Sequence, residues 1–206
     1  MPTFMSKTAA ASLAGLGAAG AGGWGIYTLT KENPSIPFSQ RVNTEKRVIL
    51  DTSTTSHDSV WAEVVKEYEK KGDIKEVPKG SNAQEKLKLY CQNSKSSTSS
   101  SFEEFRKYQD YCTRENLITK LSTSAKSWNT SKDENQWSAA ETSYKGSENT
   151  EGTLLIPKDS GTIAKASVTK QDIMSHCETI SSKPFVNEAD GDYKRGEKWC
   201  TVANNG

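Results

Sequence analysis

Two stretches of the sequence share one pattern: "WAEVVKEY" at Trp61–Tyr68 and "WSAAETSY" at Trp137–Tyr144. In each stretch the tryptophan stands seven residues before the tyrosine, a spacing that puts both rings on one face of a helix. Around the first stretch Val60, Val64 and Val65 add apolar side chains to the same face. We therefore predict a helix that buries this face in each half of the chain.

Further matches follow both stretches in the same order. They comprise a short proline motif, a single cysteine in a helical stretch and a final aromatic-Cys-Thr triplet: "VPK" at Val77–Lys79 and "IPK" at Ile156–Lys158, Cys91 and Cys177, "YCT" at Tyr111–Thr113 and "WCT" at Trp199–Thr201. Such matches in register favour a degenerate duplication. The alternative is coincidence in a chain rich in Lys, Ser and Thr.

Two more helices are expected in the first half. Asn82 with Glu85 has the pattern of a capping box, and Ser101 with Glu104 repeats it. The apolar side chains expected to face inward are Leu87, Tyr90 and Cys91 in the first of these helices and Phe102, Phe105, Tyr108 and Cys112 in the second. The fold class predicted is mainly α.

The domain plan follows from these elements. An N-terminal segment, residues 1–30, precedes a stretch at 31–57 that carries two prolines and many Ser and Thr, which favours an extended tether. Within the tether, "RVILD" at Arg47–Asp51 is compatible with one short strand. We expect a first helical repeat at 58–121, a linker at 122–134 and a second helical repeat at 135–206.

The four cysteines predict disulfides. Cys91, Cys112, Cys177 and Cys200 form an even set without a C-x-x-C pair, which disfavours zinc-finger and thioredoxin-like sites. The alternative is four buried free thiols. Separations of 21 and 23 residues predict the pairs Cys91–Cys112 and Cys177–Cys200. Such bridges are kept in an oxidising compartment and would support a chain of which 33% is hydrophobic.

The N-terminal segment favours a membrane anchor. From Thr8 to Leu29 there are 22 residues without a charge, and a helix of that length spans about 33 Å, enough for a bilayer core of about 30 Å. A stripe of small residues recurs at every fourth position and would let two such helices approach closely: Ala11, Gly15, Ala19 and Gly23. A signal peptide cleaved after "AGA" and a soluble Ala/Gly-rich tail remain as alternatives.

The same segment contains "GLGAAG" at Gly15–Gly20, which fits the G-x-G-x-x-G fingerprint of dinucleotide-binding sites. That fingerprint works after a buried strand and at the start of a helix. The preceding residues lack a β-branched run, so we do not expect a nucleotide cofactor, and no other cofactor is indicated.

Catalytic and metal sites are not indicated by the remaining residues. The two histidines are His57, in a polar run, and His176, beside Cys177, so a Cys177–His57 pair is conceivable but disfavoured. Cys and His do not have metal-ligand spacing. The 27 basic and 26 acidic residues leave a net charge of +1, which argues against a nucleic-acid partner.

The opening "MSKTAAASLAGLGAAGAGG" from Met5, the tryptophan helix, the spaced single cysteines and the terminal "WCT" resemble large paralogous families of uncharacterised proteins in haemotropic mycoplasmas. The resemblance implies a wall-less bacterium on red blood cells, an N-terminal membrane segment and a body at the cell surface. It implies no catalytic residues.

These observations lead to one functional expectation and one alternative. We expect a membrane-anchored surface protein without enzymatic activity, with its body outside the cell, serving in host interaction or antigenic variation. Its partners would be the membrane and a host protein or antibody. The alternative is a secreted soluble binding module, released by signal cleavage.

Overall fold

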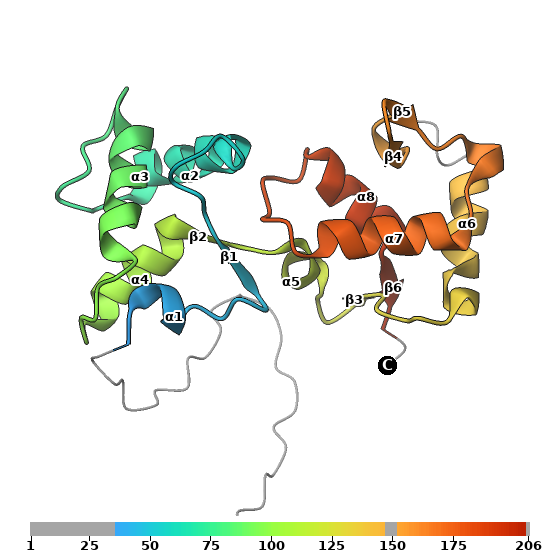
Figure 1. The fold of residues 1–206 in the computed structure, drawn as a ribbon, viewed down its shortest axis with the longest axis horizontal. Coiled ribbons are helices and arrows are strands. Elements are labelled where there is room, and N and C mark those ends of the chain that lie inside the picture. Colours follow the sequence, from blue (N-terminus) through green and yellow to red (C-terminus); the bar gives the residue numbers. More distant parts are fainter. Residues whose placement is uncertain (1–35, 147–151, 205–206) are drawn as a thin grey trace, which may run out of the picture.

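The computed structural model describes residues 36–146 and 152–204, and these form two helical bodies that lie side by side (Figure 1). The fold is mainly helical, as predicted. Across these two ranges, each helix is too short or too polar to cross a membrane. The predicted membrane segment and its stripe, Ala11, Gly15, Ala19 and Gly23, lie outside the described residues.

The first body holds four helices and two strands. In chain order these are α1 (Phe38–Arg41), β1 (Arg47–Ile49), α2 (Asp58–Lys71), α3 (Ala83–Ser94), α4 (Phe102–Cys112) and β2 (Thr113–Glu115).

The second body has the remaining helices, including three short 3-10 helices, and four strands. These are α5 (Leu117–Leu121), β3 (Lys126–Trp128), η1 (Glu134–Trp137), α6 (Ser138–Lys145), η2 (Gly152–Leu154), β4 (Pro157–Lys158), β5 (Gly161–Thr162), η3 (Lys165–Ser167), α7 (Lys170–Ser181), α8 (Gly191–Trp199) and β6 (Thr201–Ala203).

The strands form three antiparallel pairs, β1 with β2, β3 with β6 and β4 with β5. In the first pair Ile49 faces Thr113, and in the second Trp128 faces Thr201. In both bodies the strand that precedes the tryptophan helix therefore pairs with the strand that follows the second cysteine.

Each body has its own hydrophobic core. In the first, α2 buries Val60, Trp61, Val64 and Tyr68, as its periodicity predicted, while Val65 is partly buried. The predicted stripe of α4 is buried except for Phe102, which is 48% exposed. The core of the second body contains Trp128, Trp137, Tyr144, Ile173, Ile180 and Trp199.

The expected tether at 31–57 is wrong from residue 36 onward. That part contains α1 and β1, and it buries Phe38, Val42 and Leu50 in the first core. The three apolar residues are widely spaced among polar ones, so they give no helical or strand period. The strand expected within "RVILD" is present as β1.

The boundary at 121 and the linker at 122–134 also need correction. Leu117 and Leu121 of α5 pack into the second core, and β3, within the expected linker, buries Trp128 there. Strand β3 is three residues long and pairs with residues about 75 positions later, so no local pattern indicates it.

Of the two expected capping boxes, one is present in half and the other is absent. The Ser101 hydroxyl accepts a hydrogen bond from the Glu104 backbone N–H at the start of α4. Asn82 caps nothing with its side chain, because its backbone (φ −101°, ψ 7°) is not in the extended conformation that an N-cap requires.

The two bodies meet around Asn116. Its backbone N–H donates to Lys46 O at 2.9 Å and its amide to Glu45 O at 2.7 Å. Next to it, the Phe185 N–H donates to Glu115 O at 2.8 Å, and Asn187 Nδ2 donates to Glu63 Oε1 at 3.0 Å. A segment of the second body thus lies alongside β2 of the first.

Candidate binding grooves

Each core is closed by one disulfide. Cys91 on α3 is bonded to Cys112 at the end of α4, and Cys177 on α7 is bonded to Cys200 just after α8. The Cα atoms are 5.3 and 5.5 Å apart, within the usual range for disulfides. This is the pairing that the spacing predicts, and all four cysteines are buried.

Trp61 on α2 and Trp137, at the end of η1 just before α6, form similar hydrogen bonds. Trp61 Nε1 donates to Asp51 O at 2.8 Å, and Trp137 Nε1 donates to Ser131 O at 3.0 Å. Both acceptors lie in the segment between a short strand and the helix. In each body the indole therefore holds the segment that leads from the short strand to the helix.

The two tyrosines seven residues later also have corresponding contacts. The Tyr68 hydroxyl donates to backbone carbonyls at Ile74 and Val77, 3.0 and 2.6 Å away. Its ring lies edge-on to Tyr111, with centroids 5.1 Å apart.

The hydroxyl of Tyr144 both donates and accepts a hydrogen bond. Its hydroxyl donates to Ile163 O and accepts from the Ile156 N–H, both at 2.9 Å, and its ring centroid is 5.1 Å from that of Trp199. In each body the tyrosine contacts the aromatic residue that precedes the second cysteine.

The histidines do not form a catalytic pair with Cys177. His57 Nδ1 accepts from the Asp51 N–H at 2.8 Å in the first body, and burial lowers the pKa of His57. Cys177 lies in the other core with its sulfur in a disulfide. Burial and the nearby Arg195 guanidinium lower the pKa of His176 to about 4.

The acidic residues form helix caps and ion pairs. Asp190 caps α8 by accepting from the N–H groups of Asp192 and Tyr193, and Glu103 pairs with Arg106 at 2.7 Å. Across 36–146 and 152–204, no three His, Cys, Asp or Glu side chains are placed to hold a metal ion.

The larger surface groove runs along α3 and has a volume of about 510 Å³. Its apolar floor includes Phe38, Ile74 and the 48% exposed Leu89. Charges of both signs surround it: Asp73, Lys75, Glu76, Lys86, Glu104 and Lys107. The mixed rim does not select one ligand charge.

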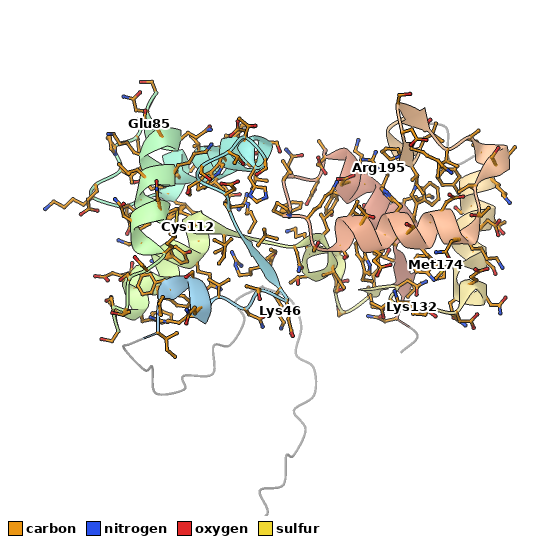
Figure 2. The ribbon with its side chains drawn as sticks, viewed as in Figure 1. Lys46, Glu85, Cys112, Lys132, Met174 and Arg195 are labelled. Carbon is orange, nitrogen blue, oxygen red and sulfur yellow. A yellow bond between two sulfur atoms is a disulfide. The ribbon has the colours of Figure 1, made fainter. Side chains whose placement is uncertain are left out.

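A second groove, the α7 groove, has a volume of about 430 Å³ and lies between α7 and the segment at 128–132. Trp128, Trp137 and Met174 contribute its large side chains. Lys132 and Glu178 stand on its two sides, 3.3 Å apart and mostly exposed. Figure 2 shows Met174 on α7 with Lys132 next to it.

In the first body a lysine, Lys88, lies beside the tryptophan of α2. Lys88 stands three residues before Cys91, as Met174 stands three before Cys177. Its Nζ lies 5.9 Å from the ring centroid of Trp61 and 2.7 Å from Asp58 Oδ1. The Lys88 side chain is 19% exposed, which is low for a lysine.

The groove residues Trp128 and Met174, and Lys88 beside Trp61, were not singled out in the sequence. A signal for two of them exists, because Lys88 and Met174 hold the same position before the first cysteine of each half. Trp128 has no such signal, since its strand has no period.

No known protein-family model, curated protein or solved structure matches this chain.

Proposed function

We propose that this chain is a membrane-anchored surface protein whose two-unit, disulfide-closed body lies outside the cell and acts as an interaction or antigenic surface, without enzymatic activity. The partners are the membrane, through the N-terminal segment, and a host protein or antibody at the body.

The observation that carries the proposal is the pair of disulfides. Both are buried; one joins α3 to the end of α4, and the other joins α7 to the residue just after α8. Structural disulfides form in oxidising compartments and are rare in the cytosol. An outward-facing body supplies that environment.

The position at which the described body begins supports a short connection between the body and the membrane. If the anchor ends at Leu29, six residues remain before Ile36, where the described body starts. Six extended residues reach about 20 Å. The body would then lie near the bilayer rather than on the long tether expected from 31–57.

The duplication belongs to the same proposal. It is supported by the matching tryptophan and tyrosine hydrogen bonds, by a disulfide from the middle helix to the end of the last one, and by a strand pair that closes each body. The proposed units are 36–115 and 116–204, with α1 and α5 in equivalent places.

Protease treatment of intact cells tests the location. We expect trypsin to remove the body from whole cells, while the residual N-terminal peptide stays in the membrane fraction. A cytosolic protein of the same cells must stay uncut as the control for lysis. A body that is protected in intact cells and cut after lysis would contradict the proposal.

The second candidate, a secreted binding module, differs in its N-terminus. Sequencing of the mature protein would start near Gly22 if the signal is cleaved after "AGA", and before Thr8 if the segment is kept. Recovery of the cleaved form from the medium would replace the anchored proposal by the secreted one.

A further inference from the structure

We infer that the α7 groove is a binding site for a lysine side chain presented by a partner protein. The inference rests on the proposed correspondence between the two bodies, and it does not depend on the membrane anchor. The ligand chemistry is read from the first body, where the chain supplies its own lysine.

In the first body three side chains form one unit. Asp58 and Trp61 are one helical turn apart on α2, so they share a face. Lys88 from α3 reaches across to pair with Asp58, while its ammonium lies within cation–π range of Trp61. An acid and an indole thus bind a lysine that is largely withdrawn from solvent.

The second body keeps the acid and the indole. Glu134 stands three residues before Trp137, and both belong to the 3-10 helix η1. Because a 3-10 helix has three residues per turn, the side chains of Glu134 and Trp137 are stacked on the same side. Glu134 is exposed and forms no ion pair with the described residues.

The lysine is replaced by methionine. Met174 is partly buried against the second core and carries no charge, so Glu134 and Trp137 lack the cation that Asp58 and Trp61 have. A groove of about 430 Å³ opens beside Trp137, three residues after Glu134 on η1. A lysine stem would pack on Met174 and Trp128, while its ammonium would lie near Trp137 and Glu178. Glu134, three residues before Trp137, is the acid that corresponds to Asp58.

The chain's own Lys132 is a weak competitor. Its bridge to Glu178 joins two side chains that are 79% and 74% exposed, and exposed pairs contribute little. Removing the Lys132 charge should therefore strengthen the binding of a cationic ligand. A groove that binds only apolar groups would not show this effect.

The test uses the full-length chain in detergent micelles and two short probes, acetyl-Ala-Lys-Ala-amide and the same peptide with norleucine. The indole N–H resonances of Trp137 and Trp61 report binding at each site. We expect the lysine peptide to shift Trp137 with an affinity at least fivefold higher than the norleucine peptide, and to leave Trp61 unchanged. Equal affinity for the two peptides would overturn the inference.

Four variants sharpen the result. M174K should abolish the shift of Trp137, because its own lysine would lie beside Trp137 as Lys88 lies beside Trp61. E134Q should weaken the binding of the lysine peptide at least threefold. K132A should strengthen that binding about twofold. K88M should give Trp61 a response to the lysine peptide. Urea unfolding of each variant checks that it is folded. Binding that survives in M174K would overturn the inference.

Two further outcomes are informative. If M174K raises the urea midpoint but the wild-type chain does not bind the peptide, the correspondence between the bodies is supported and the binding site is rejected. A Trp137 shift that grows with protein concentration alone would make the occupant a second copy of the chain and overturn the assignment to another protein.

Discussion

At the scale of single residues, Tyr68 on α2 and Tyr144 on α6 hold loops to their cores. Tyr68 and Tyr144 are fully buried, and their hydroxyls bind backbone groups 6 to 19 residues further along the chain. A third buried tyrosine, Tyr108, has no hydrogen-bond partner for its hydroxyl among the described residues. These three positions differ in what the hydroxyl contributes to stability.

Tyr144→Phe should be the most costly of the three hydroxyl deletions. It removes a donor to Ile163 O and an acceptor for the Ile156 N–H, and leaves both backbone groups buried. We expect a loss of about 2–3 kcal/mol in the free energy of unfolding, against about 1–2 kcal/mol for Tyr68→Phe. Urea denaturation measures both.

The matched control is Tyr108→Phe. Because its hydroxyl is buried and unpaired, its removal should leave stability unchanged or raise it. A cost for Tyr108→Phe as large as for Tyr144→Phe would contradict this account.

Tyr108 also predicts how the fold responds to alkali. Burial raises the pKa of Tyr108 to about 12. Burial is also the largest cause that raises the pKa of Tyr111 to about 12. An unfolded tyrosine ionises near pH 10, so the unfolded state loses its proton first. Stability present below about pH 10 should therefore fall as the pH rises toward 12.

Urea midpoints at pH 8, 10 and 11.5 check this expectation. The wild-type midpoint should fall across the series, and that of Tyr108→Phe should fall less, since residue 108 no longer titrates. Parallel curves for the two proteins would show that Tyr108 does not contribute.

At the scale of elements, the sequence predicts the longer amphipathic helices well and the short helices and strand pairings poorly. Period 3.6 in the apolar residues marks α2 and α4, because each helix buries one stripe. Strand β1 pairs with β2 across about 65 residues and each has three residues, so no local period marks their pairing. The α7 groove was missed for the same reason: it forms only when Trp128 of β3 meets Met174 of α7.

Helix caps provide a test at this scale. Thr169 and Asp172 form a reciprocal capping box at the start of α7, and the Thr169 hydrogen bonds lower the pKa of Asp172. Thr169→Ala should cost about 1 kcal/mol in the free energy of unfolding. Thermal or urea unfolding measures the change.

Asn82→Ala is the control for the cap. Both residues precede a helix of 12 residues, but the Asn82 side chain forms no capping bond. Its replacement should change stability by less than about 0.5 kcal/mol. Equal losses at the two positions would mean that capping does not distinguish them.

At the scale of the whole molecule, stability is divided between two cores with one disulfide each. The cysteines are at most 3% exposed, so a reductant reaches the sulfur atoms only when a body opens. Each bridge closes a loop of 21 or 23 residues, which corresponds to about 3 kcal/mol in the chain-entropy model.

Reduction should therefore require unfolding. We expect dithiothreitol at neutral pH to leave both disulfides intact for hours without denaturant, and to reduce both within minutes in 6 M urea. Alkylation of new thiols followed by mass spectrometry measures the fraction. Rapid reduction of one bridge in native buffer would show that its body opens easily.

The paired strands have a consequence for how such a chain can change over generations. Ile49 lies opposite Thr113 and Trp128 opposite Thr201, so in each body the segment that leads into the tryptophan helix lies beside the segment that follows the second cysteine. If the two bodies arose by duplication, as proposed, each carries both strands of its own pair, so the loss of one body leaves the other pair intact. A chain of residues 36–115 alone should therefore fold, and urea unfolding of that chain would measure it.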